Sequence, residues 1–192
     1  MELSLRRRIW QEFYEEKFGV DPQRVPQVLA IPNSELIFPI PVVKEVGVGL
    51  VIQELTQSNE NHLRWNYPLR AGVFPQRDRP IGSYVVYARA NAGSDIGFES
   101  RSVSWALKNK VRVMTLKERL LFELYRRYMD EPRLDSDTWT LCSDVLESGQ
   151  DIPAVGWEDG SFCVKPISIS FASHLHRIRE VLLQPRIKPP PP

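Results

Sequence analysis

The chain has 192 residues, the size of one ordinary domain. Hydrophobic residues make up 42% of the chain and charged residues 26%, a balance that excludes wholesale disorder. The formal net charge of +1 excludes a chain that is strongly basic or strongly acidic throughout.

The lengths of the apolar runs in the sequence predict neither a signal peptide nor a membrane span. The basic triplet at residues 6–8 is followed by Ile9 and Trp10 and then by the polar Gln11 and Glu12, whereas a signal peptide needs an apolar stretch of roughly 7–15 residues there. No run approaches the roughly 18 apolar residues of a membrane span. We therefore expect a cytoplasmic protein without membrane association, in which Cys142 and Cys163 are reduced thiols.

Charge is spread unevenly along the chain. Residues 62–112 carry nine basic and three acidic side chains, a net charge of +6, whereas residues 130–160 carry one and nine, a net charge of −8. Two interpretations stay open. The basic and acidic stretches pair with each other across the fold, or they form separate faces, of which the basic one binds anions.

The first half of the chain begins with a predicted helix over residues 3–18, which Gly19 ends. Its apolar residues recur at helical spacing: Leu5, Ile9, Trp10, Phe13, Tyr14 and Phe18. Prolines over residues 20–44 favour short edge strands, at 27–31 and 35–38. Residues 46–57 are apolar with two glycines and predict a stronger strand.

Residues 58–82 have no clear period and predict a long loop, and residues 84–90 predict a strand. A helix is expected over 99–109, with Val103, Ala106 and Leu107 facing inward, followed by extended chain over 111–114. Thr115 and Glu118 then form a capping box that begins a helix reaching about Met129. On the solvent-exposed face of this helix, Glu123 is expected to pair with Arg126 or Arg127.

The last third of the chain predicts strands over 138–142, 152–157 and 162–171, with Asp159-Gly160 as a hairpin turn and Pro166 at an edge or a kink. A helix is expected over 173–183. We therefore predict an α+β fold over residues 1–184, a single domain with a mainly antiparallel sheet and about four helices. Residues 185–192 are expected to form a disordered, proline-rich tail.

Catalytic motifs are absent from the sequence. There is no phosphate-binding glycine loop, no nucleophile elbow and no Cys-x-x-Cys pair. We therefore predict no catalytic residue and no cofactor. A metal site is the weaker alternative, because Asp and His side chains are common metal ligands. Its candidate ligands are Asp135, Asp137, His174 and His176.

The long loop carries the one constellation that suggests binding, since cations and aromatic rings alternate there. The candidate residues are Arg64, Trp65, Tyr67, Arg70, Arg77 and Arg79. Single-stranded nucleic acid offers phosphates to arginine and unstacked bases to aromatic rings. The alternative is structural, with the rings anchoring the loop to the core and the arginines stacking on them.

The segment from Trp139 onward resembles small bacterial proteins of unassigned function. Those proteins carry a Trp-Thr-Leu-Cys strand, a Gly-Ser-Arg-type loop and a Val-Pro-x-Val-x-Trp strand. Here the matching residues are Trp139-Thr-Leu-Cys142, then Ser148, Gly149 and Asp151, and then Ile152-Pro153-Ala-Val155-Gly-Trp157. The Gly-Ser-Arg sequence of that loop is missing from this chain. The resemblance covers the C-terminal quarter alone and implies a hairpin and a bacterial source, but no activity and no site residue.

The leading functional hypothesis is a non-catalytic binding protein that contacts single-stranded nucleic acid through residues 58–82. The first alternative is a metal-dependent enzyme that uses the Asp and His set. The second is a protein-binding module that uses the N-terminal helix or the proline tail. The sequence sets no oligomeric state.

Overall fold

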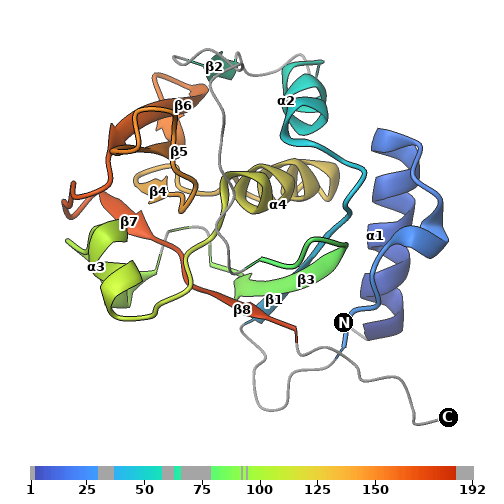
Figure 1. The fold of residues 1–192 in the computed structure, drawn as a ribbon. Helices are drawn as coiled ribbons and strands as arrows, with labels where there is room; N and C mark the ends of the chain where they lie inside the picture. Colours follow the sequence, from blue (N-terminus) through green and yellow to red (C-terminus); the bar gives the residue numbers. More distant parts are fainter. Residues whose placement is uncertain are drawn as a thin grey trace, which may run out of the picture.

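A computed structural model describes residues 3–29, 37–57, 63–65, 79–91, 93 and 95–184. Within these ranges the fold has four α-helices and two sheets, which confirms the α+β class (Figure 1). The helices are α1 (Leu3–Phe18), α2 (Val48–Gln57), α3 (Val103–Lys108) and α4 (Leu116–Tyr128). The strands are β1 (Ile37–Val42), β2 (Leu63–Trp65), β3 (Tyr84–Arg89), β4 (Trp139–Leu141), β5 (Asp151–Glu158), β6 (Ser161–Ser168), β7 (His176–Ile178) and β8 (Val181–Leu183). Short 3-10 turns span Pro22–Arg24 and Ile96–Phe98.

The strands form two sheets rather than the one that the sequence suggested. The smaller sheet is antiparallel, in the order β1-β3-β8. The larger sheet has the order β2-β6-β5-β4-β7 and is mixed, because β2 runs parallel to β6 and β7 runs parallel to β4. The chain passes from the larger sheet to the smaller one through the two residues that separate β7 from β8.

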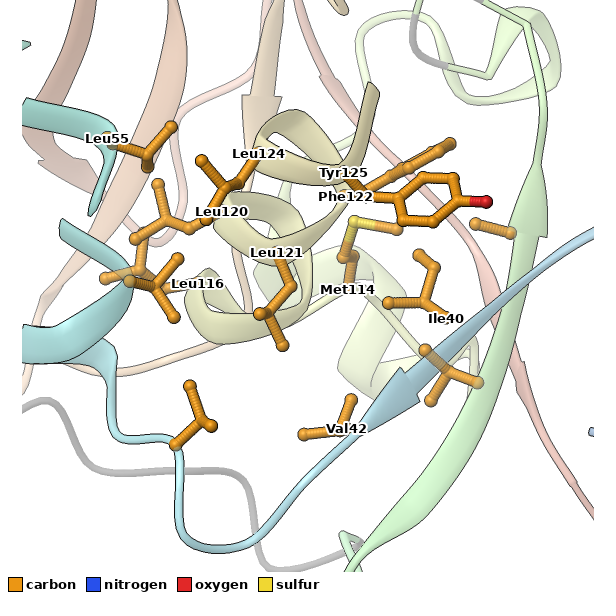
Figure 2. Close-up of a cluster of buried hydrophobic side chains, with 14 of the residues drawn as sticks. Ile40, Val42, Leu55, Met114, Leu116, Leu120, Leu121, Phe122, Leu124 and Tyr125 are labelled. Atoms are coloured by element: carbon orange, nitrogen blue, oxygen red, sulfur yellow. The ribbon is translucent and has the colours of Figure 1, made fainter. Parts of the chain in front are cut away.

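Helix α4 lies between the two sheets and organises the main core (Figure 1). The side chains around it come from α2, from β1 and from the helix itself (Figure 2). Helix α1 closes the other side of this core, with Trp10 stacked on Tyr125 at a ring-centroid distance of 3.8 Å. Full burial of each large apolar side chain contributes about 1.5–3 kcal/mol, so this core dominates the stability of the fold.

A second apolar cluster lies on the face of the larger sheet that points away from α4. Val103 and Ala106 of α3 pack there against Leu141, Ile152 and other sheet residues. Helix α3 begins with a side-chain cap, in which Ser102 accepts a hydrogen bond from the backbone N–H of Trp105 at 3.1 Å. The larger sheet is therefore covered on both faces, by α4 on the inner face and in part by α3 on the outer one.

Several local predictions are confirmed. Helix α1 has the expected bounds, and Gly19 follows it with a positive φ of 61°. The Thr115 and Glu118 capping box is present at the start of α4. Asp159 and Gly160 join β5 to β6 with positive φ angles of 49° and 72°, as a tight hairpin turn requires. Pro166 lies beyond the part of β6 that pairs with β2, so its missing N–H interrupts no ladder on that side.

The prediction of a strand over residues 46–57 is wrong, since Val48–Gln57 is helix α2. Val51, Ile52 and Leu55 are buried on its inner face, a spacing that suits a helix. The prediction of a helix over 173–183 is also wrong, because β7 and β8 occupy this segment. The apolar residues of segment 173–183 fit the period of a helix or that of a strand. The segment is extended because β7 pairs with β4 and β8 pairs with β3.

Three smaller expectations also fail. Residues 27–29 form no strand, and the strand expected at 35–38 is seen as β1, Ile37–Val42. Leu107 is 44% exposed rather than inward-facing. Glu123 is fully buried, although it does pair with Arg127 at 3.6 Å, because α4 is enclosed on all sides.

Candidate nucleic-acid interface

One row of residues crosses the outer face of all five strands of the larger sheet. The strand registers place Arg64, Cys163, Gly156, Trp139 and His176 opposite one another in turn. Residues that pair directly across strands project from the same face of a sheet. With a strand separation of about 4.8 Å, four steps carry this row across roughly 19 Å.

The centre of the row is a tryptophan that lies against a glycine. A Cβ atom added to Gly156 would lie 2.8 Å from the indole Cδ2 of Trp139 and 2.9 Å from the carbonyl oxygen of Thr138. No other residue type fits at this position without displacing the ring or the backbone. The absence of a side chain on Gly156 therefore sets where the Trp139 ring lies on the sheet.

A lysine covers the Trp139 ring. The Nζ atom of Lys165 lies 3.6 Å from the ring centroid, a close cation–π contact. Lys165 follows Cys163 by two residues on β6 and so projects from the same face. Its ammonium also lies 3.7 Å from Glu158, which is half exposed, so the ion pair is weak.

Beyond Trp139 the row continues with two more rings. His176 lies nearly parallel to Trp139, at 11° and 5.9 Å between centroids, and Phe171 meets His176 edge-on at 5.0 Å. Phe171 is 39% exposed. Burial and the neighbouring Lys165 lower the pKa of His176, so this ring is neutral at pH 7.

The opposite end of the row is Arg64. Its side chain is 51% exposed and lies 3.8 Å from the exposed Asp159 carboxylate. An ion pair of this length between exposed groups contributes little and is easily exchanged for another anion. The face thus combines two exchangeable cations with the exposed Phe171 ring, the half-buried His176 ring and a Trp139 ring that is 9% exposed under Lys165.

The predicted loop residues have different positions. Tyr67, Arg70 and Arg77 lie outside the described residues. Trp65 packs against the main core, on the inner face of the sheet, so Arg64 and Trp65 point to opposite sides. Structural anchoring therefore applies to Trp65.

Arg79 is also part of the interior. Its side chain is 3% exposed and donates to both carboxylate oxygens of Glu118, at 2.7 and 3.1 Å. It donates as well to the carbonyl oxygen of Val113 at 2.7 Å. In this arrangement Arg79 holds α4 in place and is not available to a phosphate.

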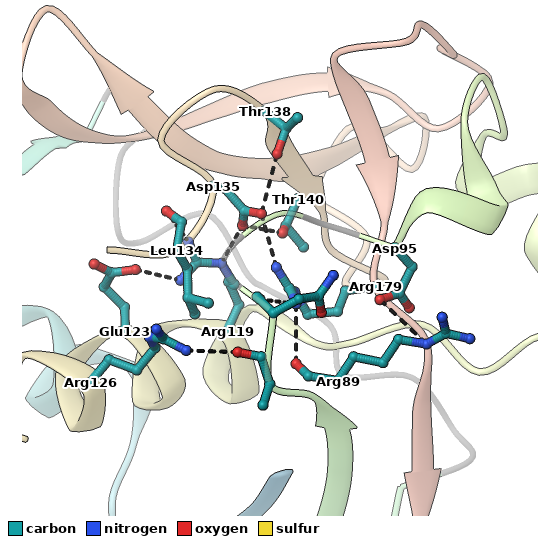
Figure 3. A network of polar contacts seen from close by, with 12 residues as sticks. Arg89, Asp95, Arg119, Glu123, Arg126, Leu134, Asp135, Thr138, Thr140 and Arg179 are labelled. Carbon is teal, nitrogen blue, oxygen red and sulfur yellow. Dashed lines mark hydrogen bonds and ion pairs between the residues drawn. The ribbon is translucent and has the colours of Figure 1, made fainter. Parts of the chain in front are cut away.

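The candidate metal ligands are not brought together. Asp135 is fully buried, and its carboxylate accepts hydrogen bonds from Arg119 and Arg179 at 3.0 Å each and from the hydroxyl of Thr140 (Figure 3). Asp137 and His174 are exposed, and His176 belongs to the aromatic row. Among the described residues no three His, Cys, Asp or Glu side chains are placed to hold a metal ion.

Asp135 is the centre of a buried ionic network instead. Arg119 also pairs with Glu123 at 3.0 Å, and Arg179 also donates to the carbonyl oxygens of Arg89 and Asn91 (Figure 3). This network ties α4 to the segment before β4 and to the turn between β7 and β8. Because the buried charged groups of this network pair with one another, the network has a structural role.

The proline-rich tail predicted at residues 185–192 lies outside the described residues, and the other sequence candidates are part of the core. Cys142 and Cys163 are buried and unpaired with each other, and burial raises the pKa of each thiol, which disfavours the reactive thiolate. The apolar stripe of α1 is occupied by the core, since Trp10, Phe13 and Tyr14 are fully buried. In the part of the chain that is described, no helix has the length and apolar character to cross a membrane.

Comparison of the chain with protein-family models, with curated proteins and with solved structures finds no match. The resemblance of the Trp139–Trp157 segment to small bacterial proteins stays a prediction.

The sequence did not indicate Trp139, Lys165 and Phe171 as candidate binding residues. Their positions on one face depend on the register of β6, β5, β4 and β7, which is not written in any local motif. One signal was present, because the strands predicted over 138–142 and 162–171 placed Trp139 and Lys165 in the same sheet.

Proposed function

We propose that this chain is a non-catalytic protein that binds single-stranded nucleic acid on the outer face of its larger sheet. The observation that carries the proposal is the contact between Lys165 and Trp139, in which a cation covers an aromatic ring on a sheet face. Such a pair offers the two groups that single strands require, a positive charge for phosphate and a π-face for a base.

The rings and cations have complementary roles in this proposal. Lys165 leaves the Trp139 ring for a phosphate, and a base takes its place or stacks on the exposed ring of Phe171. At the other end of the row, Arg64 exchanges its weak contact with Asp159 for a second phosphate. The contacts are with backbone and base faces, so little sequence preference is expected.

The sequence pattern supports the same class of ligand. Arg64, one of the cations that the sequence indicated, lies on this face, although the aromatic partners come from β4 and β7 rather than from its own loop. A metal-dependent enzyme has no support in the arrangement of the described residues. A cytoplasmic location fits a nucleic-acid ligand and is part of the proposal.

The test is fluorescence anisotropy with a labelled oligothymidylate at low salt. Loss of one stacked base costs about 1–3 kcal/mol, so Phe171→Ala should weaken binding by about fivefold or more. Leu182→Ala is the matched control, because Leu182 is an apolar residue that is 43% exposed on β8, in the other sheet. Equal affinity of the Phe171→Ala variant and the control would overturn the assignment to this face.

A further inference from the structure

A second feature of the molecule is a cavity of about 260 Å³ between the first residues of α2 and α4. Val48 lies on one side, and Thr115 and Lys117 lie on the other. The segment from Arg79 to Gly82 and the side chains of Lys44, Tyr84 and Asp144 complete its walls. The cavity shares no residue with the sheet face described above.

Three residues that line the cavity, Arg79, Tyr84 and Thr115, are held in place by the buried Glu118. Its carboxylate accepts two hydrogen bonds from Arg79, one from the hydroxyl of Tyr84 at 2.9 Å and one from the N–H of Thr115 at 2.8 Å. Asp144 is 3% exposed and accepts a hydrogen bond from the N–H of Leu116, at the start of α4. These groups fix the shape of the cavity.

The two lysines of the cavity differ from the arginine, because neither has a carboxylate partner among the described residues. The Nζ atom of Lys117 donates to the carbonyl oxygen of Val43 at 2.8 Å, but no described carboxylate lies within ion-pair distance of it. The same holds for the exposed Lys44. With Arg79 neutralised by Glu118, the cavity carries an excess of positive charge.

The positive charge is also poorly solvated. Burial lowers the pKa of Lys117 to about 8, against the opposing pull of Glu118 and Glu45. Burial likewise raises the pKa of Asp144 to about 7, with Glu118 raising it and Arg79 lowering it, so its neutral form can donate a hydrogen bond. A desolvated ammonium and a neutral carboxyl group that line the same cavity favour an anion there.

We propose that this cavity binds a small organic anion, whose oxyanion lies between Lys44 and Lys117 and whose apolar part lies against Val48, Pro80 and Ile81. Ile81 is 92% exposed at the cavity, an unusual position for a large apolar side chain and one that a ligand would cover. The volume is at the small end for ligand pockets, which fits a single ring or a short chain. This inference is independent of nucleic-acid binding.

The test is isothermal titration calorimetry at pH 6.5 with benzoate, phenyl phosphate and inorganic phosphate, and with benzyl alcohol as an uncharged control. We expect millimolar or tighter binding of the aromatic anions and none of benzyl alcohol. The stronger of the two aromatic anions identifies the preferred oxyanion. Absence of any anion binding at about 1 mM, or equal binding of benzyl alcohol, would overturn the proposal.

Two variants locate the binding in this cavity. Lys44→Met and Lys117→Met should each lower the affinity for the better anion at least fivefold, whereas Lys108→Met, on the exposed side of α3, should leave it unchanged. Lys44 is the safer change, because its side chain makes no hydrogen bond like that of Lys117 to Val43. Unchanged affinity in the Lys44→Met variant would contradict the site even if Lys117→Met failed to fold.

Discussion

Arg179 and Asp135 meet at 3.0 Å, although they are 44 positions apart in the chain and neither side chain is exposed. Arg179 comes from the turn between β7 and β8, where the chain passes from the larger sheet to the smaller one. Asp135 also binds Arg119 of α4. A single buried carboxylate therefore connects the central helix to the crossing between the sheets.

We predict that Asp135→Asn destabilises the fold by about 3–5 kcal/mol, because it removes the carboxylate that pairs with the buried Arg179 and one of the two carboxylates that pair with the buried Arg119. That is a large part of the stability of a domain of this size. The measurement is urea unfolding followed by tryptophan fluorescence. The control is Asp137→Asn, an exposed aspartate two residues away. A loss below about 1 kcal/mol for Asp135→Asn would show that the network is not essential to stability.

A second prediction concerns the contact between Gly156 and Trp139. Gly156→Ala places a methyl group 2.8 Å from the indole and 2.9 Å from a backbone oxygen, so we expect a loss of about 1–3 kcal/mol. Because the ring must move, binding to single strands should weaken as well. Thermal unfolding and oligonucleotide anisotropy measure the two effects.

Gly49→Ala is the matched control for this change. Gly49 lies near the start of α2, with no atom within 4 Å of the added methyl group. Alanine favours a helix over glycine by up to about 1 kcal/mol, so this variant should be equally or more stable. Equal stability of both glycine variants would contradict the close packing at Gly156.

A third prediction concerns the pH dependence of stability. Burial raises the pKa of Asp144 from 3.8 to about 7, so the folded protein holds this proton more tightly than the unfolded chain does. The stabilisation that this bound proton contributes is fully present below about pH 4 and is lost as the pH rises through 7. At about 1.36 kcal/mol per pH unit, the loss amounts to about 4 kcal/mol.

Asp144→Asn isolates this effect, since the amide oxygen can still accept the hydrogen bond from the N–H of Leu116. Chemical unfolding of the wild type and of Asp144→Asn between pH 4 and pH 8 gives the comparison. We expect the wild type to lose stability relative to the variant as the pH rises. A constant difference across this range would mean that the pKa of Asp144 is the same in the folded and unfolded states.

The sequence predicts those elements whose signals are local. The capping box at Thr115 and the Asp159-Gly160 turn are short motifs that fix their own geometry, and both are present. Residues 46–57 and 173–183 lack such motifs, and their apolar residues fit a helix or a strand. There the decision comes from tertiary partners, since α2 packs on α4, and β8 pairs with β3.

The candidate interface was predictable in its chemistry but not in its position. Arg64 was found from the alternation of cations and rings, whereas Trp65, next to it, packs on the opposite face. Arg79 belongs to the same alternation of cations and aromatic rings as Arg64, yet Glu118 of α4 neutralises the charge of Arg79 in the interior. Which arginine reaches solvent depends on partners far along the chain, and composition carries no such information.

The salt dependence of oligonucleotide binding tests the central claim most directly, in the wild type and in the double variant Arg64→Gln/Lys165→Gln. Each phosphate contact to a single strand contributes about −0.7 to the log–log salt slope, so the double variant should show a slope smaller by about 1.4 and weaker binding at low salt. Arg8→Gln/Arg24→Gln removes the same charge from exposed positions on and beside α1, on the far side of α4 from the larger sheet (Figure 1), and should keep the wild-type slope. An unchanged slope in the Arg64→Gln/Lys165→Gln variant, or no binding by the wild type at low salt, would contradict the account.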